Sequence, residues 1–396
     1  MEGVWLEVDC QVCGAKEAEA VYERSFETAE LDRAHMRLVL CSRCGFLYAS
    51  PRPSPETMAE HYRSSPSASG AVWHAHGKGS RHERIAAYRS GFVARLREEL
   101  PASGSVLDVG SSQGDMLCAY DLPEWRLVGL EPSALAAARA RERGLEVVEA
   151  SLESNDLPPA SFDLVTCWSV LEHVWDVRSA VAELARLTKP GGHLVVYVPD
   201  SARPTAQISE FFSFEHLSHF TTGTLYRLVQ DVGLHPLRLE HSEGPGLTLA
   251  LRREDVASTA ALPVPDDRDE LVAALRRYGH ERAAFEDGIR RRFEHLLADW
   301  REHSTRVALF GAGEHTRFLL DLVGLGEHLV AVLDSDPTKN GRRFLRWTVH
   351  PPEAAPDLGV DVIVISSRPF QEEMAAAAEP LALAHGIEIV RCYPEW

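Results

Sequence analysis

The residues of this chain that are best suited to chemistry are histidines and cysteines that recur at short spacings. One group lies in FEHLSHF, residues 214–220, where Glu215 directly precedes His216 and His219 follows. Imidazole has an ordinary pKa near neutrality, so a histidine here is suited to take a proton from a substrate while the carboxylate orients it. A Glu-His pair in a loop is also a common local hydrogen-bonding cluster, so its place in the fold must decide between the two.

The cysteines form a second group. Four of the seven occur as two CxxC pairs, in CQVCG and CSRCG, and each pair is followed by a glycine that permits a tight turn. Four thiols in two such pairs suit tetrahedral zinc better than disulfides, and four thiolates leave no open position for a substrate. The pattern predicts a structural zinc site, and its ligands are Cys10, Cys13, Cys41 and Cys44.

A third pattern, VLDVGSSQGD at residues 106–115, predicts a ligand-binding turn at the edge of a sheet. Its first residues are mostly apolar, as in a buried parallel strand, and a helix is expected to begin near Asp115. A second apolar run, VGLE, ends in Glu131, 21 positions beyond Gly110. This arrangement places a flexible backbone turn and a carboxylate where an adenosine could lie across them.

A second glycine turn, GAGEHT, follows the apolar run that starts near Arg306. It has Gly311 and Gly313 but a threonine where the dinucleotide fingerprint has its third glycine, and Asp334 follows about where a ribose carboxylate belongs. We interpret it as an incomplete dinucleotide site. The first turn, GSSQG, does not fit that fingerprint either, so its ligand is expected to be an adenosine compound that needs no phosphate cradle.

The elements that must position these groups alternate between helices and strands. Helices are predicted at 133–143, 176–187 and 221–233, and strands at 145–149, 162–167 and 193–198. Such alternation predicts a doubly wound parallel sheet, in which FEHLSHF follows the fifth strand at the carboxyl edge, where ligands bind. One or two charged helices are expected over 267–303, followed by a second, Rossmann-like α/β unit.

Residues 61–80, HYRSSPSASGAVWHAHGKGS, have the composition of a loop. A loop of this length is either a linker or a lid over a site. If it is a lid, Tyr62 is the first candidate to face a ligand.

Composition narrows the function further. A chain of 396 residues is expected to form two or three domains. The net charge of −18 repels phosphate backbones and argues against general nucleic-acid binding. The sequence shows neither an apolar run of membrane-spanning length nor a secretory leader, so a cytoplasmic protein is expected.

Taken together, these residues resemble class I S-adenosylmethionine-dependent methyltransferases. The resemblance rests on Asp108 before the glycine turn, on Glu131, on FDLV, on LEHV at 171–174 and on KPGG at 189–192. It implies that Glu131 accepts the ribose hydroxyls of S-adenosylmethionine and that Ser151 and Leu152 border its adenine. The implied donor-binding residues are Asp108, Gly110, Ser111, Gln113, Gly114, Glu131, Ser151 and Leu152.

The order of parts along the chain is similar to that of three-domain, zinc-containing sugar C-methyltransferases, which methylate a nucleotide-linked ketodeoxysugar in antibiotic biosynthesis. The expected parts are a zinc-binding domain at 1–66, a methyltransferase domain at 67–255, a helical linker at 256–303 and a Rossmann-like domain at 304–396. C-methylation beside a ketone needs a base that takes the α-proton, and the resemblance implies His216 for that role. It further implies Glu215 as its partner, Tyr62 closing the pocket and His173 at the pocket floor.

The sequence departs from that subfamily at the flanks of the histidine loop. Those enzymes usually have HEHLSYF, whereas this chain has Phe214 and His219. The extra imidazole leaves open O- or N-methylation of a small natural-product intermediate, for which His216 or His219 would suffice. A non-catalytic zinc-ribbon or nucleotide-binding adaptor is the remaining alternative. A monomer or weak homo-oligomer is expected.

Overall fold

The computed structural model describes residues 4–26, 34–64, 81–205, 211–242, 244–254, 263–368 and 370–393. The chain packs as two compact units, of which the first comprises Met1–Thr205 and Phe212–Arg276 and the second Ala206–Phe211 and Arg277–Trp396. The expected division into four parts remains a prediction. None of the described helices is both long and apolar enough to cross a membrane.

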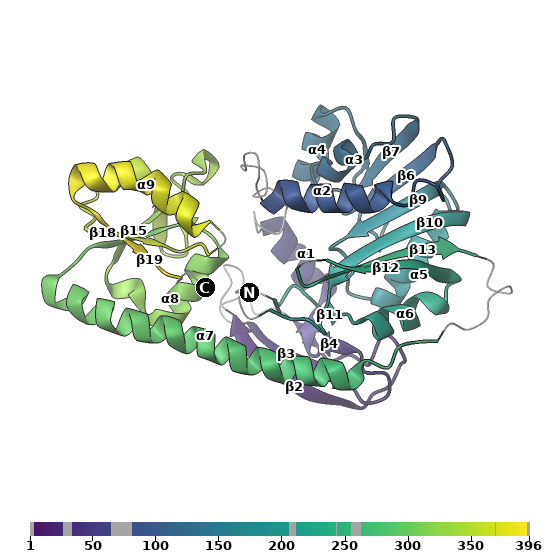
Figure 1. Cartoon of the computed structure of the whole chain (residues 1–396), viewed down its shortest axis with the longest axis horizontal. Coiled ribbons are helices and arrows are strands. Elements are labelled where there is room, and N and C mark those ends of the chain that lie inside the picture. The colour runs from purple at the N-terminus through teal and green to yellow at the C-terminus, as the bar shows by residue number, and fades with distance from the viewer. Residues whose placement is uncertain are drawn as a thin grey trace. The chain divides into compact units, whose positions relative to one another are not determined.

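The first unit is built on a seven-stranded sheet with the order β12-β13-β10-β9-β6-β7-β8 (Figure 1). Five strands are parallel, while β13 runs antiparallel between β10 and β12. The order reverses at β6, so the crevice beyond the carboxyl ends of β6 and β9 is the expected ligand site. The strands are β6 (Gly104–Val109), β7 (Trp125–Leu130), β8 (Glu146–Val148), β9 (Phe162–Trp168), β10 (Thr188–Pro199), β12 (Leu234–His241) and β13 (Gly246–Arg253).

Helices cover both faces of this sheet, which is why its central strands are apolar throughout. Alternate strand residues point to opposite faces: Val106, Leu164 and Val195 to the face that α2 covers, and Leu107, Val165 and Val196 to the face that α5 covers. The helices are α2 (Arg81–Ala94), α3 (Asp115–Ala119), α4 (Ala134–Glu142), α5 (Val177–Leu187) and α6 (Thr222–Gln230). The predicted doubly wound sheet is thus confirmed, with an antiparallel edge.

Local caps explain where these helices begin. Asp176 accepts hydrogen bonds from the backbone amides of Arg178 and Ser179 at the start of α5. Thr221 and Thr224 form a reciprocal capping box at the start of α6. Such caps satisfy amide groups that have no partner within the helix, so the predicted helix starts lie within a few residues of the observed ones.

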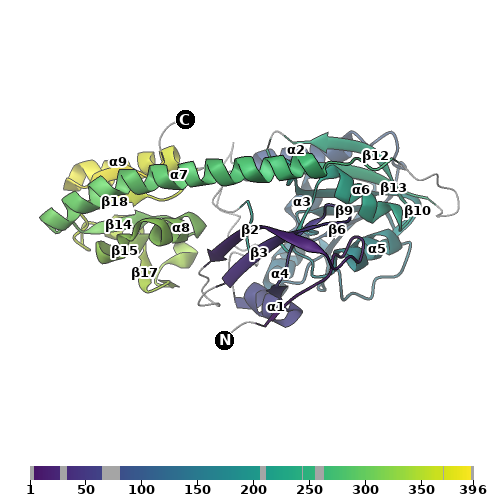
Figure 2. The same cartoon turned by 90° about the horizontal axis from the view of Figure 1, so that it is seen from below.

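The cysteine-bearing segment adds small sheets to the first unit (Figure 2). One has the order β11-β4-β3-β2, and β1 pairs with β5 in another. Strand β11 comes from the histidine loop after β10, so this loop is hydrogen-bonded into the N-terminal sheet. The elements are β1 (Trp5–Leu6), β2 (Ala18–Phe26), β3 (Ala34–Cys41), β4 (Leu47–Ala49), β5 (Arg52–Pro53), α1 (Pro55–Ser64) and β11 (Ser218–His219).

Helix α1 corrects one expectation. The segment predicted as a loop from residue 61 is helical as far as Ser64. Glu56 lies in the first turn of this helix, and Ser54 accepts a hydrogen bond from the amide of Thr57, so a local start signal outweighs the polar composition. Residues 65–80, the rest of the expected loop, lie outside the described residues.

The second unit is a separate α/β fold. Its six-stranded sheet has the order β16-β17-β15-β14-β18-β19 and is parallel except for β16. The 267–303 stretch forms a single helix, α7 (Arg268–His303), which begins in the first unit. The other elements are β14 (Val307–Phe310), α8 (Glu314–Val323), β15 (Leu329–Leu333), β16 (Arg343–Phe344), β17 (Trp347–His350), β18 (Val362–Ile365), α9 (Gln371–His385) and β19 (Glu388–Arg391).

Candidate functional site

The glycine turn after β6 folds tightly against its neighbours. Gly110 has a φ of 70°, and its amide donates to the carbonyl of Leu130 at 2.8 Å. A Cβ at Gly110 would collide with the side chain of Val170, and one at Gly114 with that of Leu145. Both glycines are therefore required by positive φ and by close packing, which brings the segment after β9 directly against the turn.

Glu131 ties this turn to the next helix. One of its carboxylate oxygens accepts from the amide of Ser112 and the other from that of Ser133, both at 2.8 Å. Burial raises the pKa of Glu131, while the two backbone hydrogen bonds oppose that rise. The carboxylate is held in one orientation, and each oxygen keeps a second lone pair for a further donor such as a ribose hydroxyl.

Two polar groups in the turn have no hydrogen-bond partner among the residues that the structure describes. The hydroxyl oxygen of Ser111 and the amide nitrogen of Gln113 are buried without a hydrogen bond. Buried polar groups are normally paired, so unpaired ones in a turn of this kind fit a site that a polar ligand completes. The residues expected near adenine follow β8: Ser151 is partly buried, and Leu152 is 4% exposed and belongs to the apolar core.

Asp108 lies beneath the turn rather than at its surface. It is 2% exposed, and one carboxylate oxygen accepts from the hydroxyl of Thr166 on β9 at 2.6 Å. Burial raises the pKa of Asp108 to about 7, although the Thr166 hydrogen bond and nearby Arg89 oppose the rise. This hydrogen bond joins β6 to β9 beneath the turn, so Asp108 has the contacts of a residue that supports the turn.

The histidine loop meets the turn that follows β9. The amides of Leu217 and Ser218 donate to the carbonyl of Glu172 at 2.7 and 3.2 Å. The rings of His173 and His216 then lie edge to face, with centroids 4.8 Å apart. The structure thus brings together two predicted residues from separate loops at the carboxyl edge of the sheet.

Glu172 is part of this group, although it is not among the site residues predicted from the sequence. It is 2% exposed, and its carboxylate lies 4.0 Å from the Nε2 of His173. Burial raises its pKa, while His173 and Arg89 oppose the rise. The ligand atoms of Glu172, His173 and His216 all lie within 4.8 Å of one another, close enough for a shared proton network or a metal ion. The sequence signal that could have indicated Glu172 is its place in LEHV, directly before His173.

The remaining residues predicted for this site differ in accessibility. His219 is 3% exposed, packs against Phe212 and has its pKa lowered well below the usual range, chiefly by burial. Its ring centre lies 6.3 Å from that of His216, so His219 packs beside the candidate base and its burial keeps it from solvent. Glu215 is partly buried, beside His216 in the loop. Tyr62 falls in α1, and its side chain lies outside the described residues.

Arg52 holds the histidine loop in place, and sequence reasoning missed it. Its guanidinium is fully buried and donates to the carbonyls of Ala49, Trp175 and Leu217 at 3.1, 2.7 and 3.2 Å. Burial lowers its pKa to about 10, which still leaves it charged at neutral pH. An arginine in the loop sequence SPRPSP carries no sign that it will be buried, since two of its three acceptors, the carbonyls of Trp175 and Leu217, come from distant segments.

The four paired cysteines converge as predicted. The sulfurs of Cys10 and Cys44, and those of Cys13 and Cys41, lie 3.5 Å apart, and all four sulfurs lie within 4.8 Å of one another. The amides of Gly14 and Gly45 fold back onto the carbonyls of the first cysteine of each pair, with φ near +70°. The cluster is compatible with tetrahedral zinc, whose thiolate ligands need this proximity.

The second unit contains a similar carboxylate in a different electrostatic setting. Asp334 accepts from the amides of Ala312 and Asp336, at 2.8 and 2.9 Å, as Glu131 does in the first unit. The ammonium of Lys339, however, lies 2.8 Å from Asp334 and also donates to the carbonyl of Ala312. Among the residues that the structure describes, no lysine or arginine pairs with Glu131 in this way.

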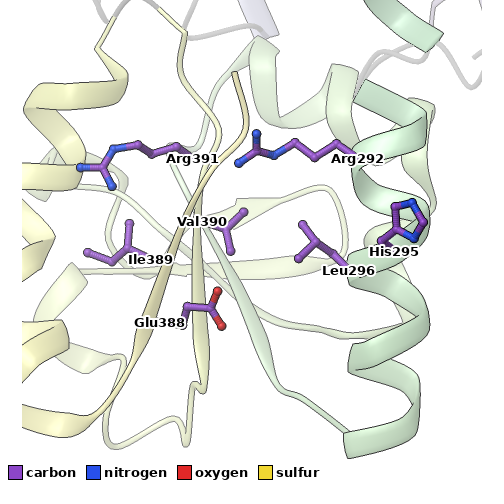
Figure 3. Close-up of a pocket in the computed structure, with 7 residues that line it drawn as sticks. All are labelled: Arg292, His295, Leu296, Glu388, Ile389, Val390 and Arg391. Carbon is purple, nitrogen blue, oxygen red and sulfur yellow. The ribbon is translucent and has the colours of Figure 1, made fainter. Parts of the chain in front are cut away.

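A cavity of about 460 Å³ lies elsewhere in the second unit, between α7 and β19 (Figure 3). Its lining comprises Arg292, His295, Leu296 and the β19 residues Glu388, Ile389, Val390 and Arg391. Neither the glycine turn nor Asp334 contributes to it, so it adds no group to the candidate site.

The first unit is similar in sequence to known methyltransferases. Residues 80–239 match a family model described as a methyltransferase domain. A ubiquinone biosynthesis O-methyltransferase of Pectobacterium carotovorum is 30% identical, over 44% of this chain and 84% of the relative. One of Cronobacter sakazakii is 36% identical, over 31% of this chain and 53% of the relative, so the match spans about half of that protein.

Among solved structures, a possible histamine N-methyltransferase from Thermotoga maritima is 22% identical, with a TM-score of 0.36 over 43% of this chain and 89% of that one. The [4+2]-cyclase SpnF is 17% identical, with a TM-score of 0.41 over 52% of this chain and 98% of that one.

Burial of Asp108 predicts a pH-dependent cost. Its pKa is raised to about 7 in the folded chain and is near 4 when unfolded, so between these values the folded state binds more protons and this group lowers stability as pH rises. The neutral variant Asp108→Asn escapes this cost. As the pH rises from 4 to 8, the free energy of unfolding of this variant should therefore increase relative to that of the native chain, by up to about 4 kcal/mol. Urea unfolding across this range measures the difference.

The control for this prediction is Asp121→Asn, which changes an exposed carboxylate near the same sheet. Its free energy of unfolding should follow that of the native chain at every pH. Parallel curves for Asp108→Asn and the native chain would contradict the assignment.

Proposed function

The chain belongs to the class I S-adenosylmethionine-dependent methyltransferases, and from this premise we propose that it methylates a carbon of a nucleotide-linked ketosugar in natural-product biosynthesis. The observation that carries the proposal is the meeting of His173 and His216 beside buried Glu172. This group adjoins the glycine turn, because Val170, two residues before Glu172, packs against Gly110. A base and a donor site at one sheet edge are what methylation beside a ketone needs.

The residues of the turn fit the donor. Glu131 would accept its ribose hydroxyls, and the unpaired groups of Ser111 and Gln113 would be completed by its polar atoms. Leu152 would border its adenine. When bound, S-adenosylmethionine supplies an electrophilic methyl group on a positively charged sulfur.

The proposed chemistry assigns one proton transfer to the histidine loop. His216 takes the proton from the carbon beside the acceptor's carbonyl, and the electron pair of that C–H bond passes into an enolate. The enolate carbon then forms a bond to the methyl group as the sulfur–methyl bond breaks, which leaves S-adenosylhomocysteine. His173 and the Glu172 carboxylate stabilise the imidazolium that His216 becomes.

A second candidate is O-methylation of a small natural-product intermediate. It is favoured by the curated relatives, which are named O-methyltransferases. A hydroxyl acceptor needs only deprotonation and alignment, so the same His216 would serve. The two candidates differ in whether a carbon-bound proton is exchanged.

Exchange with solvent deuterium tests the base and separates the candidates. With S-adenosylhomocysteine bound and a nucleoside diphosphate-linked ketodeoxysugar in D₂O, the native chain should place deuterium at the carbon beside the carbonyl. His216→Gln should slow this exchange by about 10²- to 10⁴-fold, because a general base contributes rate of that order. Mass spectrometry or NMR of the sugar measures it.

The matched control is His35→Gln, an exposed histidine of the same unit that contacts Ser25 and Glu23. It should exchange as fast as the native chain, and both variants should bind S-adenosylhomocysteine normally. Undiminished exchange in His216→Gln would remove the assigned base. Methyl transfer to oxygen with no deuterium uptake would favour the second candidate.

We also propose that the four-cysteine cluster holds one structural zinc ion. Its support is the sulfur geometry and the two glycine turns that bring the thiols together. Zinc would keep all four thiols deprotonated and crosslink the two ends of the β2–β3 region, which also carries the sheet that holds β11.

Metal analysis tests the zinc proposal. The purified chain should contain about one zinc per molecule, and Cys10→Ser should lose most of it and unfold at lower temperature, since structural zinc contributes directly to folding. Cys118→Ser is the control, because Cys118 is an exposed cysteine outside the cluster. A zinc content that Cys10→Ser leaves unchanged would contradict the proposal.

A further inference from the structure

Glu172, His173 and His216 have the side chains and the spacing of a metal site. Their ligand atoms, one from each side chain, all lie within 4.8 Å of one another. A point therefore exists within about 2.8 Å of all three atoms, whereas the bonds of zinc to nitrogen and oxygen are about 2.0–2.2 Å long. Movements of less than about 1 Å in each side chain would complete the coordination.

The carboxylate of Glu172 has an oxygen to offer to a cation. Glu172 is 2% exposed, and its Oε2 is buried without a hydrogen-bond partner among the residues that the structure describes. Within the same part of the chain, no lysine or arginine forms an ion pair with it, and the basic atom nearest to it is the Nε2 of His173 at 4.0 Å. Buried carboxylates in proteins are normally paired or coordinate a metal, so this oxygen points to a ligand.

The backbone holds the three side chains together before any ion binds. The carbonyl of Glu172 accepts from the amides of Leu217 and Ser218 at 2.7 and 3.2 Å. The segment that carries His173 is thereby tied to the one that carries His216. Ligands that are already in place lose little freedom on binding, and the side chain of His173, which is 26% exposed, gives an ion access from solvent.

Two imidazoles and one carboxylate determine the kind of ion. Imidazole suits zinc and the other divalent first-row transition ions, whereas magnesium and calcium prefer oxygen ligands throughout. Three protein ligands also leave one position of a tetrahedral ion open, which the four thiols of the cysteine cluster do not. The group is therefore suited to an exchangeable transition-metal ion, and it differs in this from the proposed structural zinc site.

We propose that Glu172, His173 and His216 bind one divalent transition-metal ion, such as Zn²⁺, and that this ion inhibits the enzyme. The inhibition rests on the proposed function, in which His216 is the base. A neutral imidazole has one nitrogen with a lone pair and one N–H group. Once the lone pair binds the metal, none is left to take the α-proton of the acceptor. The metal ion and the substrate proton therefore compete for His216.

Titration of the chain with Zn²⁺ tests the site without any acceptor. In calorimetry, the native chain with its cysteine cluster already loaded should bind one further zinc ion. His173→Gln should weaken this binding by at least about 100-fold, because even groups that only hydrogen-bond to metal ligands contribute about 10- to 100-fold to affinity. Glu172→Gln should have the same effect. Mg²⁺ at the same concentration should show no binding to the native chain.

The matched control is His35→Gln, which removes an exposed histidine whose Nε2 lies 3.8 Å from the carboxylate of Glu23. This variant should bind Zn²⁺ as the native chain does. An ion that binds only the folded chain also stabilises it, so added Zn²⁺ should raise the melting temperature of the native chain and of His35→Gln but not that of His173→Gln. Because the shift on adding zinc is compared, a variant that is merely less stable is recognised.

Deuterium exchange at the α-carbon of the ketodeoxysugar measures the inhibition. Added Zn²⁺ should stop the exchange in the native chain, and dialysis that removes the added zinc should restore it. His173→Gln should need at least about 100-fold more Zn²⁺ for the same fractional loss of its own rate, in proportion to its weaker binding.

Three results would overturn the proposal, and each is recognisable. Equal affinity for Zn²⁺ in the native chain, His173→Gln and Glu172→Gln would remove the metal site. Binding of Zn²⁺ that leaves the exchange unchanged, or speeds it, would remove the inhibition. If the native chain showed no exchange even without added zinc, the proposed function would fail and the inhibition with it, whereas the zinc titration would still decide whether the metal site exists.

Discussion

The candidate site depends on the buried guanidinium of Arg52. It joins the carbonyls of Ala49, Trp175 and Leu217, which belong to the cysteine-bearing segment, the turn after β9 and the histidine loop. Removing a charge from water is costly unless its donors are satisfied, so this geometry holds only while all three segments stay together. The N-terminal sheet is therefore part of the scaffold that positions His216, and pairing of β11 with β4 extends the same connection.

The two glycine turns have similar backbone hydrogen bonds but differ in the polar groups that surround their carboxylates. Glu131 and Asp334 each accept two backbone amides after the second strand of a parallel sheet. In the second unit, Lys339 neutralises the carboxylate and occupies the space beside it. In the first unit, Ser111 and Gln113 instead have unpaired polar atoms within the described part of the chain. The proposed ligand would pair with these atoms, whereas in the second unit the chain's own lysine pairs with the carboxylate.

Local patterns predicted the parts of this structure that local physics determines. Apolar runs gave the strands, the glycine spacing gave the turn before Asp115, and the two CxxC pairs gave the sulfur cluster. Arg52 and Glu172 were missed because their roles arise from contacts between segments far apart in sequence, which no periodicity records. Helix α1 was missed over residues 61–64 because its start lies upstream of the polar stretch.

The central claim, that Arg52 holds the histidine loop against the turn after β9, is tested most directly by amide hydrogen exchange in Arg52→Lys. Lysine keeps the charge but cannot span three carbonyls. The account predicts exchange at least about 10-fold faster over residues 213–220, where Leu217 and Ser218 donate to Glu172, and unchanged exchange at 110–114. The control Arg126→Met, at an exposed ion pair with Glu146, should change neither. Unchanged exchange over 213–220 in Arg52→Lys would contradict the account.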